Sequence, residues 1–254
     1  MYSNENPDQL AWQAMKYDML SNYYKYIDPN KAIHYYHKHL QCMQQWVMCE
    51  RSEGMGMGGG GGGTAKVRVL HASPDAPNVD VYVNGQKILE NVPYKQQSEY
   101  LEVPQGQYRI DIYAAGDTTQ PVLTQNVAVE ADRQYTVAAA GKVNQLQLIP
   151  VVDNDHTAYG NTKVRFWHLS PNAPAVDVAV KGGDVLFRNV PFGRSTRYIT
   201  VPPTTADLEV RVAGTNQVVL EVPGVTLNPN EAYTAVAVGL AGEQPPLEAI
   251  FLQP

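Results

Sequence analysis

A histidine, a serine and two aspartates lie close together after residue 70, and they are the residue types of a hydrolase triad. His71 and Ser73 would share one face of a strand, because strand side chains alternate, and Asp75 and Asp80 follow. Neighbouring side chains on a strand project in parallel, however, and the sequence lacks the Gly-x-Ser-x-Gly turn that exposes a catalytic serine. We therefore expect no catalytic residue here, and a protein that is not an enzyme.

The same motif occurs a second time further along the chain. Residues 66–74 read KVRVLHASP and residues 163–171 read KVRFWHLSP, and with one inserted residue the similarity continues to the end. We expect the imidazole and the hydroxyl to bond to the backbone of the proline-rich turn that follows, since prolines donate no hydrogen bond. The repeated residues assigned to architecture are His71, Ser73, Pro74, Asp80 and Tyr135, with His168, Ser170, Pro171, Asp177 and Tyr233 as their equivalents.

Two of these assignments leave an alternative. Asp80 and Asp177 could form a duplicated cation site, because carboxylates suit hard cations. Tyr135 and Tyr233 each follow a turn that resembles a tyrosine corner, in which the phenol bonds back to nearby backbone. The alternative for both tyrosines is an ordinary position in the core of a strand.

Alternating residues predict strands in both repeats. Val79, Val81 and Val83 alternate with Asp80 and Tyr82, so the valines share one face. Turn residues separate such short runs and no crossover helix is visible, which is typical of an antiparallel β-sandwich. Because no cysteine follows residue 49, packing alone must stabilise each sandwich.

The pattern Val-Arg-x-x-His-x-Ser-Pro-x-Ala-Pro-x-Val-Asp-Val, followed by Asn-Val-Pro and a late Tyr-Thr strand, resembles the domain-of-unknown-function 4397 family. Modules of this family are bacterial and commonly occur in tandem. The resemblance covers residues 66–254 and implies two tandem immunoglobulin-like or transthyretin-like antiparallel β-sandwiches, often in proteins of the bacterial surface. It implies no established activity.

The first 53 residues are built differently and predict a helical hairpin. One apolar stripe has helical spacing, and Asp28 and Pro29 supply an N-cap and a first-turn proline for a second helix. We expect the seam of the hairpin to join the stripe of Leu10, Ala14, Tyr17, Ser21, Tyr24 and Ile27 to that of Ile33, Tyr36 or His37, Leu40, Met43 and Val47. Other large side chains would remain outside the seam and form a surface that seeks a partner: Trp12, Tyr35, Trp46 and Met48.

These signals divide the chain into five parts. Residues 1–53 form the Tyr/Met/Cys-rich docking or oligomerisation module, and residues 54–65 form a Gly-rich flexible linker that lets this module move. The first β-sandwich covers residues 66–154 and the second covers residues 163–254, with a linker over residues 155–162.

The hairpin also carries thiols and imidazoles. Cys42 and Cys49 are separated by about 10.5 Å of helical rise, which is too far for a mutual disulfide, so they could crosslink only between chains. A reduced, packed thiol is the alternative. His34 and His37 are spaced as two metal ligands on one helix, but a structural zinc site usually takes four, so we expect no metal and no other cofactor.

Aromatic residues of the sandwiches could bind sugar rings by stacking. The candidate residues for binding such a ligand are Tyr82, Tyr94, Tyr113, Trp167 and Phe192. Only the first repeat carries tyrosines at positions 82 and 113, so the platform itself is not repeated.

Composition limits the partners. The net charge of −6 offers no basic surface for nucleic acid, and no apolar run is long enough to span a membrane. The first residues do not have the charged-then-apolar order of a secretory signal, which argues against ordinary export.

We therefore expect a non-enzymatic structural or interaction protein that displays two β-sandwiches through a self-associating or docking N-terminal module. A bacterial cell surface or spore surface is the expected location, with the cytoplasm as the alternative. The second functional hypothesis is a carbohydrate or small-ligand binding module, and the third is a hydrolase that uses the His/Ser/Asp motif.

Overall fold

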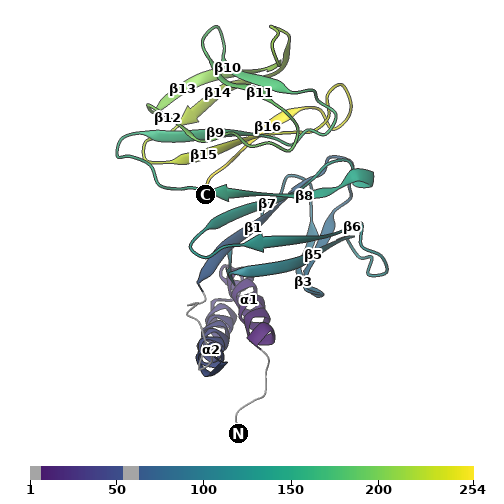
Figure 1. Ribbon diagram of the computed structural model, residues 1–254, viewed down its shortest axis with the longest axis vertical. Coiled ribbons are helices and arrows are strands. Elements are labelled where there is room, and N and C mark those ends of the chain that lie inside the picture. The colour runs from purple at the N-terminus through teal and green to yellow at the C-terminus, as the bar shows by residue number, and fades with distance from the viewer. Residues whose placement is uncertain (1–6, 54–62) are drawn as a thin grey trace.

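The computed structural model describes residues 7–53 and 63–254, with the backbone alone for residues 7, 8 and 47–53. It consists of a helical hairpin and two β-sandwiches stacked one above the other (Figure 1). The predicted flexible linker lies outside the described residues over positions 54–62. Its last two residues, Thr64 and Ala65, are not linker: they pair with Pro104 and Val103 and open the first strand.

The hairpin comprises α1 (Pro7–Tyr24) and α2 (Pro29–Glu53). The Lys31 amide donates to Asp28 Oδ1 at 3.2 Å, so Asp28 caps α2 as its sequence position predicts. No helix in the described part of the chain is long and apolar enough to cross a membrane.

The face that α2 turns toward α1 is not the predicted one. Ile33, Tyr36 and Leu40 are 57%, 50% and 38% exposed, whereas the stripe one residue earlier is buried or half-buried: Ala32, Tyr35, His39, Cys42 and Trp46. The expectation that Tyr35 and Trp46 stay outside the seam is therefore wrong. Small side chains at positions 32 and 42 allow the helices to approach closely, and Tyr35 stacks between Tyr17 and Tyr24 with ring centroids 6.2 and 5.6 Å away.

Each repeat forms two four-stranded sheets. The first repeat contains β1 (Thr64–Ala72), β2 (Val79–Val83), β3 (Gln86–Val92), β4 (Leu101–Pro104), β5 (Gly106–Ala114), β6 (Leu123–Val129), β7 (Gln134–Ala140) and β8 (Gln147–Asp153). Its sheets have the orders β4-β1-β7-β8 and β3-β2-β5-β6, and β1 runs parallel to β7.

The second repeat has the same plan. Its strands are β9 (Thr162–His168), β10 (Val176–Val180), β11 (Val185–Val190), β12 (Ile199–Val201), β13 (Thr204–Val212), β14 (Val218–Leu227), β15 (Ala232–Val238) and β16 (Glu248–Leu252). Its sheets have the orders β12-β9-β15-β16 and β11-β10-β13-β14, with β9 parallel to β15.

This architecture confirms the predicted fold class of two tandem β-sandwiches behind a helical hairpin. In constant immunoglobulin domains the first two strands belong to one sheet. Here β1 and β2 lie in different sheets, as do β9 and β10, so the transthyretin-like form is the one adopted.

Each sandwich has its own apolar core, and the two sandwiches also pack against each other. A third buried cluster joins them, formed by Leu70, Ala72, Ala138, Ala140 and Val151 of the first repeat and Trp167, Leu169, Val236, Val238 and Leu252 of the second. Sheet β4-β1-β7-β8 therefore faces sheet β12-β9-β15-β16, and both are covered on two sides (Figure 1).

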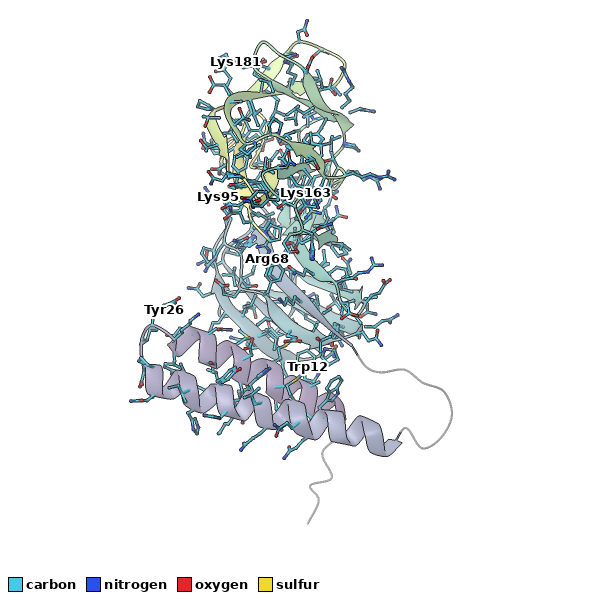
Figure 2. All side chains as sticks on the ribbon, turned by 90° about the vertical axis from the view of Figure 1, so that its left-hand side faces the viewer. Trp12, Tyr26, Arg68, Lys95, Lys163 and Lys181 are labelled. Atoms are coloured by element: carbon cyan, nitrogen blue, oxygen red, sulfur yellow. The ribbon has the colours of Figure 1, made fainter. Side chains whose placement is uncertain are left out.

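The hairpin is also fixed rather than free to move. Trp12 and Met15 of α1 belong to the core of the first sandwich, and the Trp12 ring meets the Tyr108 ring edge-on at 6.1 Å. Figure 2 shows Trp12 where the hairpin meets the sandwich, with α2 on the far side of α1 and Tyr26 at the tip. Trp12 thus lies outside the hairpin seam, as predicted, but it is not available to another molecule.

Candidate functional site

The His/Ser motif lies at the end of β1 and is buried. His71 Nε2 is 3.1 Å from the Pro77 carbonyl oxygen, and the Ser73 amide donates to His71 Nδ1 at 3.3 Å. Because a carbonyl accepts and an amide donates, His71 must be neutral with its proton on Nε2. Burial disfavours the imidazolium and lowers the pKa of His71 below its ordinary value, although the Pro77 carbonyl partly opposes this effect.

The serine hydroxyl of this motif is not paired with the imidazole. Ser73 Oγ donates to the Gly141 carbonyl oxygen at 2.7 Å and lies 3.4 Å from Asp75 Oδ1. A nucleophilic serine needs a base on its hydroxyl, and His71 instead bonds to backbone on both ring nitrogens. The geometry is that of a turn anchor and does not form a Ser–His pair.

The second repeat has the same arrangement. His168 Nε2 is 3.0 Å from the Pro174 carbonyl oxygen, and the Ser170 amide donates to His168 Nδ1 at 3.3 Å. Burial again lowers the pKa of the imidazole. Ser170 Oγ is buried and has no hydrogen-bond partner among the described residues, and Ser170 itself is 0% exposed, so a substrate could not reach it.

The repeated aspartates hold backbone amides. Asp177 accepts from the Asn189 amide at 2.6 Å and from the Gly214 amide at 3.0 Å, and these bonds hold its pKa below its ordinary value. Asn189 has a φ of 49°, a left-handed conformation that the carboxylate helps to fix. The carboxylate thus joins β10 to Asn189 near the end of β11 and to Gly214 in the turn after β13.

Asp80 does the same in the first repeat. It accepts from the Asn91 amide at 2.8 Å and from Lys87 Nζ at 2.8 Å. Burial raises the pKa of Asp80, but these hydrogen bonds outweigh it and the net shift is downward. Among the described residues no group of three or more His, Cys, Asp or Glu side chains could hold a metal ion.

Both repeated tyrosines bond to backbone five residues upstream. The Glu130 amide donates to Tyr135 Oη at 3.2 Å, and the Asn228 amide donates to Tyr233 Oη at 3.2 Å. Tyr233 also donates to the Glu231 carboxylate. These contacts have the geometry expected of a tyrosine corner and brace the turn that precedes β7 or β15.

Three of the five proposed ligand-binding aromatics lie in the interface between the sandwiches. Trp167 is 0% exposed, and Tyr94 and Phe192 are half-buried against the same cluster. The prediction that Trp167 could receive a sugar is wrong, because the ring is fully buried in the interface between the repeats, and Tyr94 and Phe192 keep only part of their rings exposed. The sequence carries a signal for this: β15 reads AYTAVAV and is buried at every position, which is typical of a strand covered on both faces.

The two other aromatics form a pair on the outer sheet of the first sandwich. The ring centroids of Tyr82 and Tyr113 are 4.8 Å apart, and both side chains are half-exposed. Lys87 Nζ lies 5.6 Å from the Tyr82 ring centroid. The pair joins β2 to β5 and combines apolar ring faces with a cation.

A buried polar network crosses the interface, and sequence reasoning missed it. Arg68 Nη1 donates to the Gln253 carbonyl oxygen at 2.6 Å, and Arg165 Nη1 donates to the Val152 carbonyl oxygen at 2.7 Å, so the repeats exchange equivalent contacts. Asp153 accepts from Arg165 and, at 2.7 Å, from Tyr100 Oη. The signal in the sequence was an arginine repeated between apolar residues, in Val67-Arg68-Val69 and Val164-Arg165-Phe166.

The exposed face of the hairpin is the largest concentration of uncovered apolar side chains in the described residues. Six of the eleven large hydrophobic side chains that are exposed there belong to residues 23–40, namely Tyr23, Tyr26, Ile27, Ile33, Tyr36 and Leu40. On α2 they recur at positions 33, 36 and 40, which is the 3.5-residue spacing at which one helix packs along another.

The described thiol and imidazoles of α2 do not form a metal site. Cys42 is buried with Sγ 3.8 Å from Gln13 Oε1, so it could reach another chain only if the helices separated. The side chain of Cys49, the other predicted crosslinking residue, lies outside the described residues. His34 and His37 are exposed, and His34 packs edge-on against Tyr35 with ring centroids 5.4 Å apart.

A family model matches the chain twice, over residues 65–179 and 177–253, and its description is domain of unknown function (DUF4397). The chain therefore belongs to this family, as its repeated motif indicated. Two matches agree with the two sandwiches, although the first match extends into β10 of the second sandwich. A search of curated proteins gave no match.

Solved structures show only distant similarity. A carbohydrate-binding module of family CBM26 from Eubacterium rectale, solved in complex with maltoheptaose, is 8% identical, with 75% of this chain and 97% of that chain covered at a TM-score of 0.25. The fimbrial anchor protein Mfa2 from Porphyromonas gingivalis is 12% identical, with 75% and 97% covered at a TM-score of 0.19. Superpositions this loose say nothing about the ligand or partner of this chain.

Proposed function

We propose that this protein is a non-enzymatic interaction protein in which the outer face of the helical hairpin binds a second copy, so that each assembly presents two pairs of joined sandwiches. The observation that carries the proposal is the exposed stripe of Ile33, Tyr36 and Leu40 on α2. Exposed apolar patches of this kind mark association surfaces.

A second copy fits this stripe better than an unrelated surface does. The heptad spacing matches what a partner helix needs, and a two-fold axis brings the same patch of both chains together. The inner stripe of α2 already packs on α1, so association does not require the hairpin to open.

The repeats themselves support a presenting role. The shared His, Asp and Tyr side chains of both repeats, and Ser73 of the first, bond to backbone or side-chain groups of their own sandwich, and the interface between the sandwiches is buried. The assembly would therefore present a rigid body. Because the family resemblance implies bacterial surface proteins, we extend the proposal to display at a cell or spore surface, which localisation of a C-terminally labelled chain would test.

The association is tested by crosslinking. Tyr36→Cys in a Cys42→Ser, Cys49→Ser background should form a disulfide-linked dimer under mild oxidation, because equivalent positions near the middle of the stripe face each other. Lys181→Cys in the same background is the control, since Lys181 lies on the second sandwich, far from the hairpin (Figure 2). Equal crosslinking of the two variants, or none for Tyr36→Cys, would reject the proposal.

The Tyr82 and Tyr113 pair supports a second candidate function, the binding of a glycan. Two tilted rings with a nearby ammonium group offer both stacking and a hydrogen-bond donor. A glycan array probed with the full chain should give saturable hits that Tyr113→Ala removes and Tyr159→Ala leaves unchanged. Tyr159 is 95% exposed and serves as a solvent-facing control.

A further inference from the structure

The first sandwich has an opening at its side, between the edge strands β3 and β4, and α1 covers it. Met15 is 6% exposed and packs between the sheets, with Trp12 on one side and Met19 on the other. A small cavity of about 40 Å³ remains beneath Met15, and its lining includes Leu89 of β3 and Leu101 of β4.

The second sandwich has the equivalent opening, between the edge strands β11 and β12. Its cavity measures about 90 Å³ and exposes no polar surface. Most of its lining residues are the repeat equivalents of those in the first cavity, for example Val201 for Val103 and Leu227 for Val129. No described helix covers this opening, and Leu186 and Val201 at its rim are half-buried.

Two substitutions between the repeats enlarge the second opening. Ala206 stands where the first repeat has Tyr108, the ring that contacts Trp12, and Ala235 stands where it has Val137. The second opening therefore has room for an aromatic side chain from a covering helix. Phe166 and Phe187 form an apolar floor, with stacked rings 6.5 Å apart.

We propose that the opening between β11 and β12 binds an amphipathic helix of a partner protein, one that presents an aromatic residue and, three residues later, a methionine or leucine. The chain itself provides the precedent, because α1 places Trp12 and Met15 at this spacing over the equivalent opening of the first repeat. A drug-sized ligand needs several times more volume than this cavity offers.

A second copy is the less suitable occupant. Each chain has one α1, and that helix already covers the opening of its own first sandwich. Moving it to another chain would uncover one opening to fill another, and the covalent link favours the internal contact. The proposal does not depend on association through α2, which uses the opposite side of the hairpin.

The probe for this site is a fluorescein-labelled peptide of residues 7–24, titrated into the full chain. We expect saturable binding with one peptide per chain, weakened at least tenfold by Trp12→Ala in the peptide or by Val201→Lys at the rim. Val218→Lys is the matched control, because Val218 is 41% exposed on the same sandwich but does not line the cavity.

Loss of binding in a rim variant supports the proposal only if that variant is folded. Circular dichroism melting of the Val201→Lys and Val218→Lys chains shows whether both remain folded, and Leu186→Lys provides a second rim variant. Failure of the peptide to bind the unmodified chain would overturn the proposal, as would binding that survives both rim substitutions. Self-association of the chain that is lost in Val201→Lys would also overturn it, since the occupant would then be a second copy.

Discussion

Arg165, in the second sandwich, donates a hydrogen bond of 2.7 Å to the carbonyl oxygen of Val152 in the first. Arg68 makes the equivalent contact in the opposite direction, to the carbonyl oxygen of Gln253. The two repeats are thus joined by reciprocal contacts, around a single buried carboxylate, Asp153. These contacts join the two sandwiches into one structural unit, instead of two domains connected only by a linker.

Removal of the Asp153 carboxylate should destabilise the folded chain strongly. We expect Asp153→Ala to lower the free energy of unfolding by about 3–5 kcal/mol, because it leaves buried guanidinium groups without their counter-ion. Urea unfolding of the full chain measures the change. Asp155→Ala is the control: its side chain is 48% exposed beside His156, and we expect a change below about 1 kcal/mol. Similar losses for both variants would contradict a structural role for the network.

The buried histidines predict a pH dependence. Burial lowers the pKa of His71 and of His168 in the folded protein from the ordinary value of 6.5. Well above pH 6.5 both are neutral whether the chain is folded or unfolded, so their contribution to stability is complete. As the pH falls below 6.5 the unfolded chain takes up protons that the folded chain does not, and stability decreases.

Urea unfolding at pH 7.5, 6.5 and 5.5 measures this dependence. We expect the His71→Gln, His168→Gln double variant to be less stable at pH 7.5 but to lose less stability on acidification. His156→Gln, at an exposed position, should retain the dependence of the unmodified chain. A double variant with an unchanged dependence would show that other groups cause it.

The tyrosine corners predict a small loss of stability when either phenol hydroxyl is removed. Tyr135→Phe leaves the Glu130 amide without its acceptor and should lower the free energy of unfolding by about 1 kcal/mol. Tyr233→Phe should cost at least as much, because that phenol also bonds to Asn228 Nδ2. Thermal unfolding provides the comparison with Tyr159→Phe, for which we expect no change.

The contact between α1 and the first sandwich should dominate the stability of the hairpin. Trp12→Ala removes a side chain that is 7% exposed, and losses of about 3–5 kcal/mol are typical of such a truncation. Amide hydrogen exchange should become faster in β4, which α1 covers. Tyr26→Ala is the control, since Tyr26 is 87% exposed, and accelerated exchange in both variants would contradict the contact.

Local patterns were sufficient to predict much of this fold. The repeated motif predicted two copies of one sandwich, alternation predicted β2, and Asp28 followed by Pro29 predicted the start of α2. Each of these features depends on residues close together in the sequence. The bonds of His71 are equally local, which is why its role as an anchor of the following turn could be predicted, whereas the amides that Asp177 binds lie 12 and 37 residues away and were not.

Contacts between elements were harder to predict. Two adjacent stripes of α2 have helical spacing, and only the shape of α1 decides that Ala32 and Cys42 face inward while Ile33 faces out. Trp167 was assigned to an exposed surface because its strand was considered within a single sandwich. Trp167 is buried by residues of the other repeat, and a pattern within one repeat cannot predict a contact between repeats.

The most direct test of association through α2 is the molar mass of the full chain in solution, measured by sedimentation equilibrium over a range of concentrations. The unmodified chain should approach twice its own mass of 28.0 kDa, and Ile33→Lys, Leu40→Lys should remain at the single-chain mass. Val122→Lys, at an exposed apolar position of the first sandwich rather than of the hairpin, should behave as the unmodified chain does. A single-chain mass for the unmodified protein at every concentration would contradict the proposed association.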